Sequence, residues 1–159
     1  MSVEEKQRLI ESLTELHNSI LAALEGIEME MYVYEDSGWR VRDIIGHIST
    51  WDQEIANSLQ AYKAGNEYLT PDLDEEEIEF NENEVLKQQK LSVQQILEEF
   101  ETAYSNFYKA IEDIPDEFFP GDLLYPWGNE SGDIRKLVGY MIEHGIEHRD
   151  EIIKASHQV

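Results

Sequence analysis

The chain has 159 residues, no cysteine, and 35 Asp plus Glu against 12 Lys plus Arg, which gives a formal net charge of −23. This length suits one compact domain over residues 1–159, and 41% apolar residues are enough to bury a core. The charge excludes nucleic acid and anionic membrane as expected partners, because both are held mainly by Lys and Arg. The lack of cysteine excludes disulfides, thiolate metal ligands and cysteine nucleophiles, so His and carboxylates would have to bind any metal.

The first residues, Met1 to Lys6, give no sign of a targeting segment, because three of them are charged. No apolar run approaches the ~20 residues that a membrane-spanning helix needs. We therefore predict a cytoplasmic protein.

Two amphipathic helices are predicted in the first half of the chain, over about 4–27 and about 41–64, the second ending at Gly65. Each carries apolar residues at spacings of three and four. In the first helix these residues are Leu9, Leu13, Leu16, Ile20, Leu24 and Ile27. In the second they are Val41, Ile44, Ile48, Trp51, Ile55, Leu59 and Tyr62.

Two further long helices are predicted in the second half. Ser92 and Gln95 form a capping box at the start of the third helix, whose apolar stripe extends to Ile114. The segment over about 79–90 reads as a preceding helical segment, joined to the third helix or kinked at Ser92. The fourth helix covers about 133–156.

The connections between these helices are unequal in length. Residues 28–40 are rich in Met and Tyr, residues 65–78 carry an acidic run, and residues 115–132 hold three prolines and three glycines. No strand pattern of any length and no internal repeat is visible. The predicted fold class is therefore all-α, a four-helix bundle.

Three histidines are the strongest candidates for chemistry. His144 and His148 stand four residues apart on the fourth helix, so both point to one side, about 6 Å apart along the axis. His47 lies on or beside the inner stripe of the second helix. Three imidazoles that face a core can bind a metal ion and leave positions open for water or substrate. The alternative is three hydrogen-bonded core histidines, and spacing alone leaves both interpretations open.

The topology provides a check on this hypothesis. His47 is near the start of its helix, whereas His148 is about eight residues from the end of the last one. The two come level only if these helices are antiparallel; in an up-down-up-down bundle they would be offset by on the order of 10 Å. An up-down-down-up bundle makes them antiparallel but needs a long crossover, for which residues 65–78 are long enough.

Two segments carry a family resemblance. Gly38 to Trp51, which reads Gly-Trp-Arg-Val-Arg-Asp-Ile-Ile-Gly-His-Ile-Ser-Thr-Trp, resembles the second-helix signature of the DinB-like (YfiT-type) metalloenzyme superfamily, nearest its ClbS/DfsB-like group. Residues 126–128 and 143–152 resemble that superfamily's last-helix region. The resemblance spans nearly the whole chain and is most specific in the two histidine segments.

This resemblance implies an up-down-down-up bundle, frequently a homodimer, in which His47, His144 and His148 bind a divalent metal ion, usually nickel, zinc or iron. It implies thiol S-transfer, thiol-dependent isomerisation or hydrolysis only loosely, because many members have no known reaction. Arg40 departs from the Ser or Thr that often caps the second helix, and its side chain cannot accept a capping hydrogen bond. We therefore expect the start of this helix to differ.

A competing motif is the inverted zinc-protease pattern, His144-x-x-Glu147-His148. Only eleven residues follow it, so no distant downstream carboxylate could complete such a site, and we disfavour this interpretation.

Other polar side chains near the predicted site are assigned less prominent roles. His17 is expected to be partly exposed and His157 solvated. Asp52 and Glu147 could accept hydrogen bonds from the ligand imidazoles, but a solvated helix face is the favoured interpretation.

The aromatic residues have two interpretations each. Tyr32, Tyr34 and Trp39 would line a pocket mouth or, as we favour, form a satellite cluster beneath their loop. Trp51 would wall a pocket or pack in the core. Trp127 is expected to plug the opposite end of the bundle, some 16 Å or more from the metal-binding histidines.

The resulting prediction is a metal-dependent hydrolase or thiol S-transferase that acts on a small molecule, such as a low-molecular-weight thiol. The alternative is a non-catalytic bundle that binds or sequesters a small molecule or protein, with structural histidines. The acidic crossover is expected to return towards the end of the bundle that carries His47, which favours neutral or cationic ligands. Any reacting thiol must come from outside the chain, because the chain has no cysteine.

Overall fold

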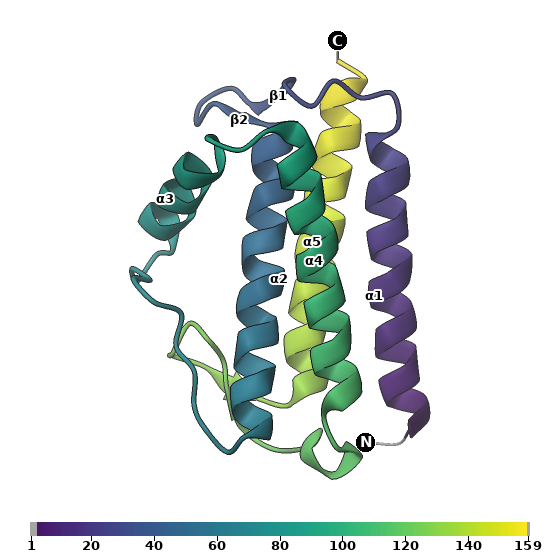
Figure 1. Ribbon diagram of the computed structural model, residues 1–159, viewed down its shortest axis with the longest axis vertical. Helices are drawn as coiled ribbons and strands as arrows, with labels where there is room; N and C mark the ends of the chain where they lie inside the picture. The colour runs from purple at the N-terminus through teal and green to yellow at the C-terminus, as the bar shows by residue number, and fades with distance from the viewer. Residues whose placement is uncertain (1–2, 159) are drawn as a thin grey trace.

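A computed structural model describes residues 3–158, and within this range four long helices form a bundle with a shorter fifth helix outside it (Figure 1). The helices are α1 (Val3–Leu24), α2 (Val41–Lys63), α3 (Ile78–Gln88), α4 (Val93–Asp113) and α5 (Ile134–Ser156). The four predicted helices are confirmed, and the helical segment before Ser92 is a separate helix, α3. No helix in the described range is both long and apolar enough to cross a membrane.

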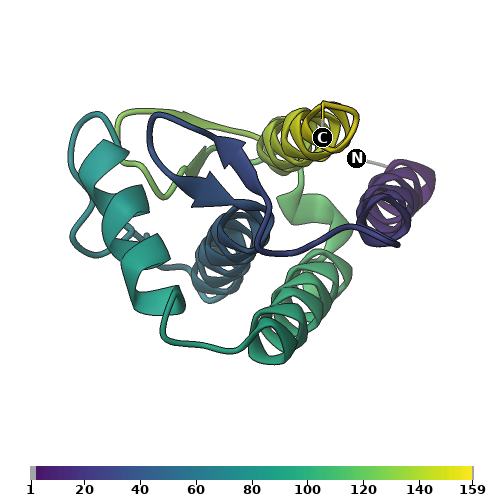
Figure 2. The ribbon, with the colours of Figure 1, turned by 90° about the horizontal axis from the view of Figure 1, so that it is seen from above.

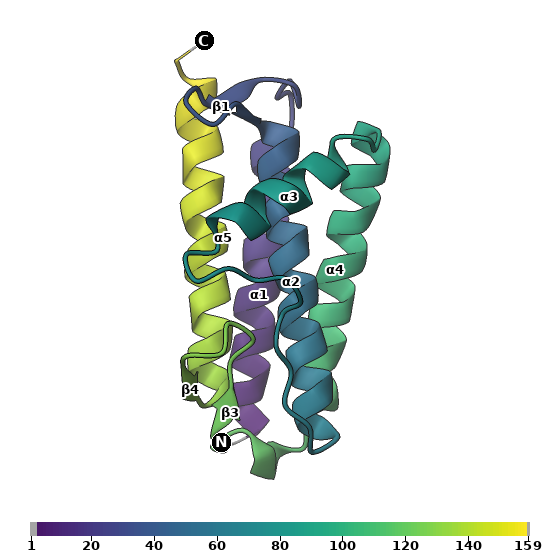
Figure 3. The ribbon, with the colours of Figure 1, turned by 90° about the vertical axis from the view of Figure 1, so that its left-hand side faces the viewer.

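The bundle has the up-down-down-up topology. α1 and α5 run in one direction and α2 and α4 in the other, so that α2 and α5 are antiparallel (Figures 1 and 3). The crossover leaves the lower end of α2 and climbs the outside of the bundle through α3 to the upper end of α4. The predicted topology and the predicted role of the 65–78 segment are therefore confirmed.

Two short antiparallel hairpins add to the helices in the described range. β1 (Tyr32–Tyr34) pairs with β2 (Trp39–Arg40), and β3 (Leu123–Leu124) pairs with β4 (Ser131–Gly132). The sequence shows no strand pattern at these positions because strands of two or three residues are too short to show an alternation, and the predicted all-α fold class is confirmed. Seen from above, the first hairpin extends over the upper end of α2, between α5 and α3 (Figure 2).

The helix ends follow local chemistry. α1 ends at Leu24 rather than near residue 27, because Gly26 adopts a left-handed conformation with a φ of 72°. The predicted capping box of α4 is confirmed: Ser92 Oγ accepts from the Gln95 amide at 3.1 Å, and Gln95 Oε1 accepts from the Ser92 amide at 2.8 Å.

The start of α2 is capped without help from the side chain of its N-cap residue. The backbone amide of Arg40 donates to the Asp43 carboxylate at 2.8 Å, and the Arg40 guanidinium pairs with Asp43 and Glu30. Arg40 therefore supplies the donors and Asp43 the acceptor, the reverse of a Ser or Thr cap. The expected difference at this helix start is present, and it fixes the helix two turns before His47.

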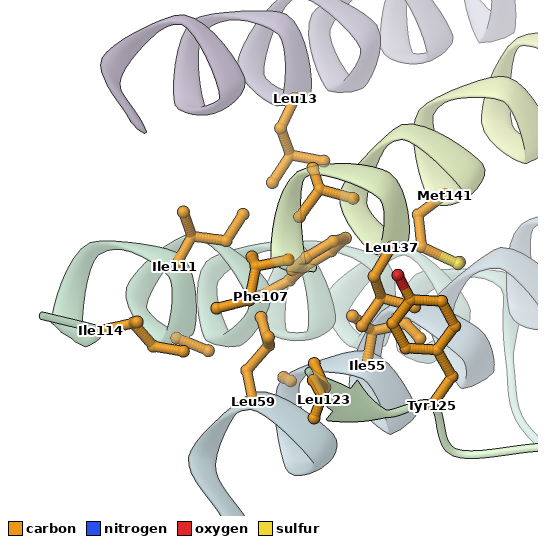
Figure 4. Close-up of a cluster of buried hydrophobic side chains, with 14 of the residues drawn as sticks. Leu13, Ile55, Leu59, Phe107, Ile111, Ile114, Leu123, Tyr125, Leu137 and Met141 are labelled. Carbon is orange, nitrogen blue, oxygen red and sulfur yellow. The ribbon is translucent and has the colours of Figure 1, made fainter. Parts of the chain in front are cut away.

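The buried core has two parts. Figure 4 shows the lower one, in which Phe107 and Ile111 of α4 pack against Leu59 of α2. The upper one is centred on Ile44 and Phe100 and is covered by the first hairpin. Residues of both parts line a narrow crevice between them, and this crevice contains two polar side chains, His17 and Asp52.

His17 is buried, with 5% of its surface exposed, so the prediction of a partly exposed side chain was wrong. Its ring stacks on Tyr104 with centroids 3.8 Å apart and also contacts Phe100. Its Nε2 lies 2.8 Å from a Glu101 carboxylate oxygen. The aromatic contacts supply the burial, and the carboxylate provides a hydrogen-bond partner for Nε2.

Asp52 is also buried, at 8% exposure, so the predicted solvated position was wrong. Among residues 3–158 its carboxyl group has no hydrogen-bond partner. Burial raises its pKa to about 8, because the apolar surroundings disfavour the charged form. Asp52 is therefore mainly protonated in the folded chain at neutral pH.

Replacing Asp52 with Asn should stabilise the protein, increasingly so as the pH rises from 5 to 8. Between the ordinary pKa of 3.8 and the raised value of about 8, the unfolded chain releases this proton while the folded chain retains it. Each pH unit in this window then lowers the free energy of unfolding by about 1.4 kcal/mol. Thermal melts at several pH values would measure the effect, with exposed Asp113→Asn as control. Identical pH dependences for wild type and Asp52→Asn would contradict it.

Candidate metal centre

The three predicted histidines come together on the inner faces of α2 and α5. His47 Nε2 lies 2.9 Å from His144 Nε2, and His148 Nε2 lies 3.0 Å from the same atom. One ligand atom from each residue lies within 4.8 Å of the other two. The antiparallel arrangement of α2 and α5 brings the beginning of one helix level with the second half of the other.

This donor set fits a metal ion better than it fits three core histidines. A neutral imidazole has one N–H and one lone pair, so a single proton on His144 Nε2 cannot be shared well between two neighbouring nitrogens. Two nitrogens bound to one ion at about 2.0–2.1 Å lie roughly 3 Å apart, which is the separation of His144 Nε2 from each of the other two nitrogens. Imidazole suits zinc, nickel and iron alike.

The electrostatic environment keeps two of the three imidazoles neutral. Burial, with smaller contributions from His144 and His148, lowers the pKa of His47 well below its ordinary value. Burial and the neighbouring His148 lower the pKa of His144 to about 3. Both side chains are therefore neutral at pH 7, the state in which an imidazole nitrogen binds a metal.

His148 is held in place by partners on its other nitrogen. Its Nδ1 lies 2.7 Å from a Glu151 carboxylate oxygen and 3.1 Å from the Tyr34 hydroxyl. An N–H at Nδ1 that donates to the carboxylate leaves the Nε2 lone pair directed at the other two histidines. Burial and Glu151 raise the pKa of Tyr34, so it remains a phenol.

Glu151 was not predicted for this role; of the two carboxylates considered, Glu147 lies on the solvated face that was favoured for it, whereas Asp52 does not. Glu147 is exposed and Asp52 lies in the crevice of the core, and neither forms a hydrogen bond to these histidines. Residues three apart on a helix are neighbours, so the spacing of His148 and Glu151 was the signal available.

The first hairpin covers one side of the three histidines. Trp39 is buried, and its ring centroid lies 5.1 Å from that of His47. The ring centroid of Tyr34 lies 5.8 Å from that of Trp39, and the Tyr34 hydroxyl forms a hydrogen bond with His148 Nδ1. Their loop is therefore part of the site and not only the satellite cluster that we favoured. Tyr32, in contrast, is exposed.

A pocket of about 280 Å³ opens on the other side of the histidines. Its walls come from α2, α3, α5 and the second hairpin loop: His47, Trp51, Glu77, Asn81, Trp127, Tyr140, Met141 and His144. Trp51 thus walls a pocket while also packing against Phe80 in the core. The presence of Glu77 confirms that the acidic crossover reaches the site.

Trp127 lies in this pocket, so its predicted place at the opposite end of the bundle was wrong. The prediction measured helical rise from the start of α5, but the loop between β3 and β4 folds back along the side of the bundle (Figure 3). Trp127 thereby lies 6.4 Å from Trp51 and 6.1 Å from Tyr140, measured between ring centroids.

Solved structures share this fold. YfiT from Bacillus subtilis, described as a probable metal-dependent hydrolase with an unusual four-helix bundle topology, is 18% identical with a TM-score of 0.77, over 99% of this chain and 89% of YfiT. An uncharacterised protein from Clostridium difficile 630 is 13% identical with a TM-score of 0.79, over 100% and 99% of the two chains.

A mycothiol-dependent maleylpyruvate isomerase is 12% identical with a TM-score of 0.75, and the match covers 92% of this chain but only 60% of the isomerase. A comparison with curated proteins finds no match. The sequence profile of the DinB family matches residues 1–159. The chain therefore belongs to the DinB family.

Proposed function

We propose that this protein is a metal-dependent hydrolase or thiol S-transferase in which His47, His144 and His148 bind a divalent ion. The observation that carries the proposal is the convergence of three imidazole nitrogens beside an open pocket. It is also supported by the similarity in fold to one protein described as a probable metal-dependent hydrolase and to another described as a thiol-dependent isomerase.

When bound, the ion would act as a Lewis acid that polarises a substrate oxygen or lowers the pKa of a coordinated water or thiol. The chain itself would position the ligands through Glu151 and Tyr34 and exclude water on one side through Trp39. The pocket has a volume of about 280 Å³, so the part of the substrate that enters it must be small. Because the chain has no cysteine, a reacting thiol would be a co-substrate.

Replacing His144 with Ala should abolish metal binding, because His144 contacts both other imidazoles and its loss leaves two nitrogens. Elemental analysis of protein purified without an affinity tag would measure this. Wild type and the exposed control His157→Ala should retain stoichiometric metal. Equal, near-zero metal in wild type and His144→Ala would disprove the proposed site.

Glu151→Gln should weaken metal affinity about 10- to 100-fold, because the amide no longer fixes the His148 tautomer by charge-assisted hydrogen bonding. Competition with a chelator of known affinity would measure the change. Glu147→Gln removes the same charge from an exposed position on the same helix and should have little effect. If the two variants lost affinity equally, Glu151 would act only through net charge.

A further inference from the structure

The pocket beside the histidines has aromatic walls whose polar atoms are already engaged. Trp51 Nε1 donates to Asn81 Oδ1 at 2.9 Å, and Trp127 Nε1 donates to a Glu130 oxygen at 3.1 Å. The Tyr140 hydroxyl donates to the other Glu130 oxygen at 2.7 Å. These three side chains therefore present mainly ring surface to a ligand.

Glu77 brings a negative charge to the same pocket and has no counter-charge. It occupies the N-cap position of α3, but Asp74 instead accepts the hydrogen bond of the Phe80 amide, at 2.9 Å. Within residues 3–158 the Glu77 carboxylate has no hydrogen-bond or ion-pair partner. Partial burial and the nearby Asp74 raise its pKa, which shows that the charged form lacks compensation here.

The backbone at Glu77 adds a second unusual feature. Its φ of 63° lies in the left-handed region, which is unfavourable for a residue other than glycine. The structure thus holds an uncompensated carboxylate in a strained conformation at the pocket wall, where it does not stabilise the helix through a capping hydrogen bond.

The surroundings repel anions. An outer groove of about 590 Å³ shares Glu77 and Trp127 with the pocket and is also lined by Asp74, Glu75 and Glu76. No Lys or Arg is among the described residues that line either cavity. Lys136, on α5, lines neither cavity; it is paired with Glu130 at 3.2 Å, and its Nζ lies 5.6 Å from the centroid of the Tyr140 ring, which shows that this ring already contacts one cation.

We propose, resting on the function proposed above, that the substrate is a small organic cation. Its charged group would lie between the Glu77 carboxylate and the aromatic walls formed by Trp51, Trp127 and Tyr140, with its reactive end towards the histidines. Aromatic walls with a carboxylate recognise alkylammonium groups through ring electrostatics and charge pairing. A neutral molecule of the same shape gains only the apolar contact.

Choline and 3,3-dimethylbutan-1-ol test this proposal, because they match in shape and hydroxyl group and differ in charge. Neither the quaternary ammonium nor its carbon analogue can coordinate a metal. Calorimetric titration of the full chain carrying its metal should show choline binding about tenfold more tightly. Equal affinities, or no choline binding, would overturn the proposal.

The variant Glu77→Gln should bring the affinities for choline and the alcohol to within about twofold of each other. Glu79→Gln removes the same charge from an exposed position on α3 that lines neither cavity, and it should keep the preference of wild type. Equal loss of the preference in both variants would overturn a specific role for Glu77. Trp127→Leu should also reduce the preference, and melting curves would show that each variant is folded.

Metal analysis of the same samples separates this proposal from the one on which it rests. Glu77→Gln should retain the metal of wild type, because Glu77 contacts none of the three histidines. If tag-free wild type contains no metal but still binds choline more tightly than 3,3-dimethylbutan-1-ol, the result would support the cation pocket and overturn the metal-dependent function. Bound metal without any choline preference would overturn the cation pocket alone.

Discussion

The site depends on three imidazole nitrogens that converge between two antiparallel helices, with those of His47 and His148 each about 3 Å from His144 Nε2. This meeting is a constraint on the whole chain. His47 follows the start of α2 closely, whereas His144 lies at the middle of α5 and His148 beyond it, so the histidines come closer to level when the two helices run in opposite directions. That requirement selects the up-down-down-up bundle, and the crossover through α3 then brings Glu77 and Asn81 to the same pocket.

The packing of the bundle has its own polar feature away from the three histidines. Its apolar core is divided in two, and His17 and Asp52 lie in the crevice between the parts. A buried carboxyl group without a partner costs stability, and a chain selected only for stability would replace it. The hairpins supply what the helices cannot: the first places Tyr34 and Trp39 at the histidines, and the second carries Trp127 into the pocket.

The long helices and the three histidines could be predicted because they depend on periodicity and spacing along one helix. The topology could be predicted because the positions of the histidines on two helices and the length of the 65–78 connection agree on it. The roles of Trp127, Asp52 and His17 could not, because they depend on how loops and helices approach one another. The position of Trp127 was predicted wrongly because the sequence of a loop rich in proline and glycine does not show in which direction the loop folds relative to the bundle. His17 was misplaced because its burial comes from the stacked ring of Tyr104 on another helix. Glu151 could have been found from its spacing to His148.

The proposed function requires that His47, His144 and His148 bind one metal ion. Anomalous scattering measured across metal absorption edges, from crystals of tag-free protein grown without added metal, tests it most directly. We expect one strong anomalous peak about 2.0–2.2 Å from a nitrogen of each of these histidines. An anomalous map without a peak at this position, or with the three imidazoles hydrogen-bonded to one another or to water instead, would contradict it.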